Sequence, residues 1–138
     1  MTVSPSQEGR ETRLERPVVL SLPVAGFVDV ARLVVGGAAS RFTLGFEAID
    51  DIQLAIETVF RAGLIDGDRV TIELTSDAEA LTIAVRPITS AALDEPIVDS
   101  DRRTIAPIAL LRQLVDSADA HREPTPALVL RKTFAAPA

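Results

Sequence analysis

Residues 48–63, AIDDIQLAIETVFRAG, predict an amphipathic helix. Apolar residues recur here at intervals of three and four, the period of one helical face, and Gly63 stands where such a helix would end. In the next segment apolar and polar residues alternate, as they do in β-strands. The two segments together predict a helix packed on a sheet, and the rest of the chain is interpreted from that arrangement. The predicted helical stripe comprises Ile49, Ile52, Ile56, Val59, Phe60 and Gly63.

The alternating segment predicts a β-hairpin with one buried face. Its two halves flank a polar turn at residues 76–80, and each half carries an apolar residue at every second position. These apolar residues are Val70, Ile72 and Leu74 before the turn and Leu81, Ile83 and Val85 after it.

The residues before this helix predict another helix and a strand. In residues 25–42 apolar side chains again recur every three or four positions, although the pair Gly36 and Gly37 interrupts them. Each glycine costs about 1 kcal/mol in a helix interior. Either the helix tolerates the pair, or a packing contact or another chain approaches closely there. Val18–Pro23 predicts a strand that suits a sheet edge, and residues 1–16 predict a disordered tail.

A polar connector, residues 88–104, follows the hairpin. Its apolar residues show neither the helical spacing of three to four residues nor the alternation of a strand. Residues 105–117 predict a helix with Pro107 in its first turn. Two strands joined by a turn at residues 123–126 follow, and the second of them is Leu128–Thr133.

The order of these elements predicts an α+β fold. Its expected architecture is a two-layer sandwich with three helices on one face of a mixed, largely antiparallel sheet, built as a single domain over residues 17–135. The 138 residues, 47% of them hydrophobic, suffice for one such domain with its own core.

Charge and composition narrow the classes of function. The net charge of −6 disfavours nucleic acid as a partner, because binding to phosphates depends on clustered Lys and Arg. The chain has no cysteine for disulfides or thiolate chemistry, and its one histidine, His121, cannot form a multi-histidine metal site. Without a secretory leader pattern or an apolar run of about 20 residues, the sequence predicts a cytoplasmic protein with no membrane partner.

Three stretches resemble a known family: VARLVVGGAASRFTLGFEAIDDIQLAIETVF at residues 30–60, LLRQLVDSADAH at residues 110–121 and ALVLRK at residues 127–132. Together with the intervening hairpin they resemble the actinobacterial anti-sigma regulatory factors. These proteins belong to the GHKL, or Bergerat-fold, superfamily of histidine-kinase-like ATPases and act as serine/threonine kinases. The resemblance runs from about Val18 to Phe134 and implies a Bergerat-like fold.

In that family a helical glutamate acts as general base, and an asparagine one turn later helps to hold Mg²⁺. Glu57 matches the glutamate, whereas Arg61 occupies the asparagine position. A guanidinium is permanently cationic and offers a metal no lone pair, so the resemblance implies a degenerate site at Glu57 and Arg61. The residues alone also allow an ordinary ion pair, since Glu and Arg four positions apart share one helical face.

Two further motifs of the family are missing. The Asp-x-Gly-x-Gly segment that binds adenine should follow residues 81–85, where this chain has RPITS. The glycine-rich lid that wraps the phosphates should lie near residues 101–109, and no glycine occurs after Gly67. The resemblance therefore implies that no cofactor is bound, with ATP and Mg²⁺ as the alternative.

The family also implies a partner-binding residue. Its kinases use an arginine in an Ala-Arg pair, near the start of the first helix, to contact both the sigma factor and its antagonist. Ala31 and Arg32 match that pair. The alternative is that Arg32 is a solvated charge on the helix surface.

Three functions remain as alternatives. The first is a regulatory protein-binding module, a pseudo-kinase that sequesters a sigma factor or binds an anti-anti-sigma (STAS-type) protein. The second is an active anti-sigma kinase that binds ATP and uses Glu57 as the base to phosphorylate an antagonist protein. The third is a dimerisation domain without a small ligand, which would make the protein a homodimer.

Overall fold

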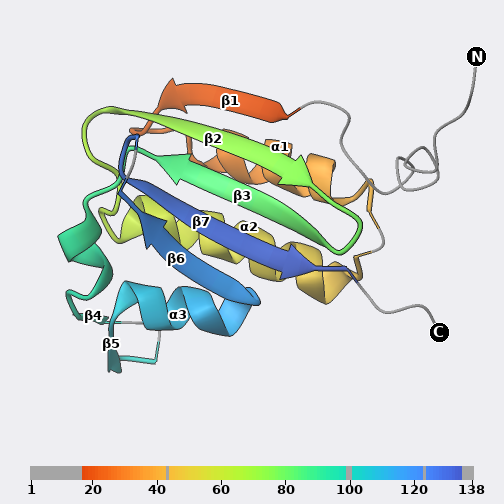
Figure 1. The fold of residues 1–138 in the computed structure, drawn as a ribbon. Coiled ribbons are helices and arrows are strands. Elements are labelled where there is room, and N and C mark those ends of the chain that lie inside the picture. The colour runs from red at the N-terminus through yellow and green to blue at the C-terminus, as the bar shows by residue number, and fades with distance from the viewer. Residues whose placement is uncertain (1–16, 43, 99–100, 123, 135–138) are drawn as a thin grey trace, which may run out of the picture.

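The computed structural model of the chain describes residues 17–42, 44–98, 101–122 and 124–134. These residues form a five-stranded sheet with helices packed on one face (Figure 1). The helices are α1 (Val28–Ala39), α2 (Phe46–Arg61) and α3 (Pro107–Leu114). The strands, in their spatial order, are β1 (Val18–Pro23), β2 (Arg69–Ser76), β3 (Ala80–Arg86), β7 (Ala127–Thr133) and β6 (Ser117–His121).

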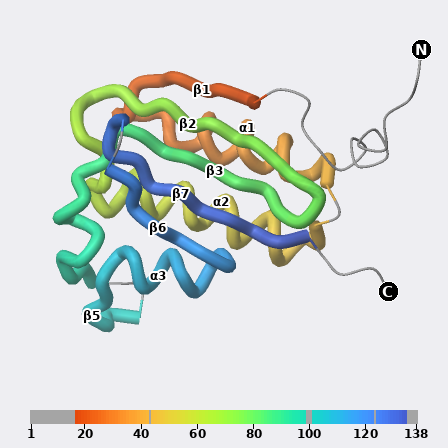
Figure 2. The backbone as a smooth tube through the Cα atoms, in the orientation of Figure 1, coloured from red at the N-terminus to blue at the C-terminus, as the bar shows by residue number. Residues whose placement is uncertain are grey.

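The predicted α+β class and its two layers are confirmed. The backbone in Figure 2 shows α1 and α2 side by side behind the sheet and α3 next to β6. β1 is an edge strand, as its proline suggested. The sheet is not mixed, because each of its four described ladders is antiparallel; two of them are hairpins, whose short turns permit only that pairing. The predicted tail, residues 1–16, and residue 135 lie outside the described residues.

The core lies between the sheet and the helices α1 and α2. Ile52, Ile56 and Val59, at the centre of the predicted stripe of α2, are fully buried. Gly63 follows the end of α2 with a φ of 68°, and the next residue, Leu64, donates its N–H to the Val59 carbonyl at 3.3 Å. This is the glycine-closed helix end that the sequence predicted.

α1 is shorter than the predicted helix at residues 25–42. Gly26 has a φ of 79°, a left-handed conformation that side-chain-bearing residues rarely adopt, and α1 begins only at Val28. After Ala39 the chain leaves the helix, and the Phe42 ring stacks on Phe134 with centroids 5.1 Å apart. The three residues at each end of the predicted helix therefore serve turns and tertiary contacts rather than the helix itself.

The two glycines of α1 have different surroundings. A Cβ atom on Gly36 would overlap the side-chain amide of Gln53 on α2, which packs there and donates to the Arg32 carbonyl at 3.1 Å. A Cβ atom on Gly37 would meet no atom within 4 Å. A close packing contact therefore explains the glycine at position 36. At position 37, no contact among the described residues requires a glycine.

This difference predicts opposite behaviour of two alanine variants. Gly37→Ala is expected to raise the free energy of unfolding by about 0.5–1 kcal/mol, because alanine favours a helix and nothing obstructs its methyl group. Gly36→Ala is expected to be less stable than Gly37→Ala by about 1 kcal/mol, since Gln53 must leave its hydrogen bond. Denaturant unfolding followed by circular dichroism measures both; equal gains would contradict the packing at Gly36.

The connector at residues 88–104 is more structured than predicted. It contains a short 3₁₀ helix at Ser90–Leu93 and a two-stranded ladder of β4 (Ile97–Val98) with β5 (Thr104–Ile105). Ile88 and Leu93 are buried. Elements of two to four residues are too short to show either the helical or the strand period, so the sequence pattern could not reveal them.

Two carboxylates close the ends of the hairpins. Asp77 accepts hydrogen bonds from the N–H groups of Glu79 at 2.7 Å and Ala80 at 2.9 Å. Asp116 accepts one from the N–H of Thr133 at 2.7 Å. These bonds favour the ionised carboxylates and hold the pKa of both Asp77 and Asp116 below the ordinary value.

A pH dependence of stability follows from these bonds. A folded-state pKa below the unfolded one adds stability that is present above the unfolded pKa and is lost as pH falls through the folded pKa. Asp116→Asn is therefore expected to be less stable than the wild type at pH 6, and the gap should close well below pH 4, where the carboxyl is protonated. Urea unfolding of both proteins across this pH range tests the prediction, with Asp94→Asn, an exposed carboxylate in the connector, as the control. A difference in stability between wild type and Asp116→Asn that persists in acid would contradict the prediction.

Candidate functional site

Glu57 and Arg61 lie one turn apart on α2 and form an ion pair. Nη2 of Arg61 is 2.8 Å from Oε1 of Glu57. The Glu57 side chain is 18% exposed and that of Arg61 is 72% exposed, so the carboxylate is the more enclosed partner. The ion pair that the spacing allowed is therefore formed, and a guanidinium covers one oxygen of Glu57.

Arg32 of α1 reaches the same carboxylate from the other side. Its Nη1 is 3.9 Å from Oε2 of Glu57 and 3.5 Å from Oδ1 of Asp29. Asp29, Arg32, Glu57 and Arg61 thus form a row of alternating charge across the two helices, which we call the charge row. Arg32 is more than a solvated surface charge, since it lies between two carboxylates, yet 40% of its side chain remains exposed.

The packing at Gly36 helps to place Arg32. Because Gly36 has no side chain, Gln53 fits against α1 and holds the Arg32 carbonyl. This contact lies one turn from the level at which Arg32 meets Glu57, so it keeps the two helices close there. Sequence spacing within one helix could not reveal this contact between helices.

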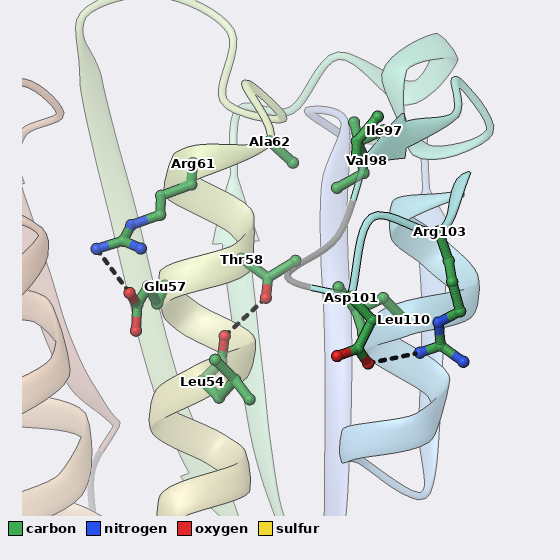
Figure 3. A pocket seen from close by; sticks show the side chains of 10 residues that line it. All are labelled: Leu54, Glu57, Thr58, Arg61, Ala62, Ile97, Val98, Asp101, Arg103 and Leu110. Carbon is green, nitrogen blue, oxygen red and sulfur yellow. Dashed lines mark hydrogen bonds and ion pairs between the residues drawn. The ribbon is translucent and has the colours of Figure 1, made fainter. Parts of the chain in front are cut away.

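Glu57 and Arg61 also lie at the edge of a cavity of about 360 Å³. Three parts of the chain surround the cavity: α2, α3, and the segment that contains β4 (Figure 3). In Figure 3, Glu57 and Arg61 point to the side of α2 away from Ile97 and Val98, so the ion pair forms a rim rather than a wall. The apolar walls are Leu54, Ala62, Ile97, Val98 and Leu110.

The polar side chains around this cavity already have partners within the chain. The hydroxyl of Thr58 donates to the Leu54 carbonyl at 2.8 Å. Asp101 and Arg103 pair with each other at 3.6 Å. Within the described parts of the chain, no buried side-chain nitrogen or oxygen lacks a hydrogen-bond partner. No buried polar group there needs a ligand to satisfy it.

Sequence reasoning missed the cavity walls. Leu54 lies off the apolar stripe of α2 and is 47% exposed, and Val98 in the connector is 68% exposed. An apolar residue out of phase with its helix is a signal that could have marked Leu54. Val98 carried no such signal, because its neighbours across the cavity are distant in sequence.

The residues present do not fit ATP with Mg²⁺. The segment after β3, where an adenine-binding motif is missing, uses its backbone internally: Thr89 N–H donates to the Leu64 carbonyl at 2.8 Å, and Ile88 N–H to that of Pro126 at 3.1 Å. The residues before α3 contain no glycine that could wrap phosphates. At the position where the resemblance expects a metal ligand, Arg61 carries a guanidinium that offers no lone pair.

The described residues also offer no other metal centre. Residues 17–42, 44–98, 101–122 and 124–134 contain no group of three or more His, Asp or Glu side chains placed to hold an ion. His121 is exposed at the end of β6. At Glu57 itself, the guanidinium groups of Arg61 and Arg32 approach the carboxylate at 2.8 and 3.9 Å.

Comparison with known proteins adds no assignment. Neither models of protein families nor a search of curated proteins gives a match to this chain. None of the helices within the described residues has the length and apolar character needed to cross a membrane.

Proposed function

We propose that the protein is a regulatory protein-binding module that resembles an anti-sigma factor and has a degenerate nucleotide site. Its partner is a sigma factor or an anti-anti-sigma protein of the STAS type, bound on a surface that includes Arg32. The observation that carries the proposal is the contact of 2.8 Å between Arg61 and Glu57, where a nucleotide-binding helix would present an amide and a free carboxylate.

This contact disfavours catalysis for a geometric reason. A general base must approach the proton that it abstracts within about 2.6–3.2 Å. The guanidinium of Arg61 already occupies Oε1 at such a distance, and Arg32 lies near Oε2. The charge row instead presents hydrogen-bonding groups on the outer side of two packed helices, which suits recognition of another protein.

One observation favours the alternative of an active kinase. The cavity beside Glu57 has about 360 Å³, within the range of about 300–1,000 Å³ that is typical of ligand sites. Its walls are mainly apolar and could accept a planar ring. The missing adenine and phosphate motifs count against this alternative, so the binding module remains the better-supported function.

The first experiment asks whether nucleotide binds at all. ATP with Mg²⁺ at millimolar concentration is expected to leave the melting temperature unchanged, whereas a ligand at a hundred times its Kd would add about 2.7 kcal/mol of stability. Calorimetry is suitable because the chain has no Trp or Tyr for intrinsic fluorescence. A nucleotide-binding GHKL protein serves as positive control, and a clear upward shift for this chain would restore the kinase alternative.

The second experiment asks what the chain binds. Tagged protein is expressed in its native host, and co-purifying proteins are identified by mass spectrometry. A sigma factor or a STAS-type protein is expected, and binding is then repeated with both purified components by calorimetric titration. If purified candidates of both classes fail to bind, the proposed function is wrong.

A further inference from the structure

A second cavity, of about 710 Å³, shares no described residue with the cavity beside Glu57. It lies between α3, the short 3₁₀ helix at Ser90–Leu93 and the edge strand β6, which runs next to α3 in Figure 1. Ile108 and Arg112 of α3 line it, whereas Leu110 lines the first cavity. Because a helix has about 3.6 residues per turn, residue 110 points away from residues 108 and 112. The two cavities therefore lie on opposite sides of α3.

Small side chains on β6 leave this space open. Alternate residues of a strand point to the same side, so Ala118 and Ala120 both face the helices. Ala118 is buried, whereas Ala120 is exposed and lines the cavity. Leu93, which is buried, and Ile108, which is half-buried, supply apolar walls. The volume is within the range of about 300–1,000 Å³ that is typical of ligand sites, so the space suits a small molecule.

Two arginines from different elements line the cavity: Arg112 on α3 and Arg122, which follows the end of β6. Contacts within the chain hold Arg112 in place, since its Nε donates to the Ala118 carbonyl at 3.1 Å and its Nη2 is 3.5 Å from Oδ1 of Asp119. Among the described residues, Nη1 of Arg112 has no partner and Arg122 forms no ion pair. Donors for an anion are therefore present on two sides of the cavity.

We propose that this cavity binds a small organic acid, with its carboxylate at Arg112 and Arg122 and its apolar body against Leu93 and Ile108. A planar guanidinium matches the geometry of a carboxylate and can donate two parallel hydrogen bonds to it. Ile108 and Arg112 lie four positions apart and share one helical face, so an apolar wall lies directly beside a cation. This pairing suits a molecule with one apolar and one anionic end.

The acidic residues nearby limit the ligand to a single negative charge. Asp94 also lines the cavity, and Asp119 pairs with Arg112. Both carboxylates repel any further negative charge, so a monocarboxylate is expected to bind and a polyphosphate such as ATP is not. Because a small acid has few non-hydrogen atoms, we expect a Kd of roughly 1 mM.

An amide NMR titration of the isotope-labelled full chain with phenylpropionate, in about 0.15 M salt, tests the proposal. The shifts should saturate and should be largest at residues 90–94, 108–112 and 118–122. Acetate has the carboxylate alone, and phenylpropanol has the apolar body without the charge. Each should bind at least about tenfold more weakly than phenylpropionate. No saturation by about 20 mM phenylpropionate, or largest shifts at Leu54 and Val98 of the first cavity, would overturn the proposal.

Three variants test the position of the ligand. Arg112→Gln and Arg122→Gln should each weaken phenylpropionate binding about tenfold, because each removes a charged donor. Ala120→Leu should abolish binding while both arginines remain, since the larger side chain fills the space. Arg41→Gln, at an exposed arginine in the turn after α1, is the matched control and should bind like the wild type.

The amide spectrum of each variant shows whether it is folded. Arg122 makes no ion pair among the described residues, so its replacement tests the proposal even if Arg112→Gln disturbs α3. Wild-type affinity in Arg122→Gln or in Ala120→Leu would overturn the proposal.

This inference goes beyond the proposed function and can fail separately from it. The titration uses the purified chain alone, whereas the proposed function is tested with a partner protein. Arg32 and Glu57 do not line this cavity, so Arg32→Ala should bind phenylpropionate like the wild type.

Discussion

Ile56→Ala is expected to lower the free energy of unfolding by about 3 kcal/mol, within the usual range of about 2–5 kcal/mol for this truncation in a core. Ile56 is fully buried at the centre of α2, in the cluster that joins both helices to the sheet. Its removal takes away apolar contacts on all sides and leaves a cavity that rigid neighbours fill only partly.

The matched control for Ile56 is Leu54→Ala on the same helix. Leu54 is 47% exposed, so its truncation should change stability by no more than about 0.5 kcal/mol. Urea unfolding followed by far-ultraviolet circular dichroism measures both variants, and the denaturant slope should not change. Equal losses for the two variants would mean that the helix packs on the sheet with a different face.

Arg32→Ala is expected to weaken binding of the partner several-fold to a hundred-fold, which corresponds to about 1–3 kcal/mol. The guanidinium can form a bidentate contact with a carboxylate or a phosphorylated serine of the partner. Stability should change little, because the pair with Asp29 is exposed and the guanidinium is 3.9 Å from Glu57, whose other oxygen keeps its closer contact with Arg61.

Three further variants test whether the loss of affinity comes from a specific contact of Arg32 or from the removal of a positive charge in general. Arg32→Lys should also weaken binding, since an ammonium cannot reproduce two parallel hydrogen bonds. Arg112→Ala on α3 removes an exposed arginine from another face and should bind like the wild type. Glu57→Ala should cost only a few tenths of a kcal/mol in stability and leave binding unchanged. Calorimetric titration measures all of them, and equal affinities for Arg32→Ala and Arg112→Ala would remove Arg32 from the interface.

Local pattern was enough to predict most of the fold. The stripe of α2, the alternation in β2 and β3 and the proline at the start of α3 were visible because each extends over at least one full period or occupies a specific position. The errors lie at boundaries and in short elements. Gly26 delays the start of α1, and the connector forms β4 and β5, which have two residues each.

Less of the candidate site could be predicted. The pair of Glu57 and Arg61 could be expected from their spacing of four, because both lie on one helix. The approach of Arg32 to Glu57 could not, since their separation depends on how α1 packs against α2. Leu54 and Val98 face one cavity for the same reason: the chain between them must fold before they become neighbours.

The sequence by itself determined the helices, the hairpins, the α+β class and the spacing of four residues between Glu57 and Arg61, because periodicity and residue chemistry are local properties. Only the tertiary structure decided that Gly36 receives Gln53 while Gly37 remains open, and that two arginines share one carboxylate. These outcomes depend on the distance between α1 and α2, which is set by the packing of side chains from both helices against one sheet.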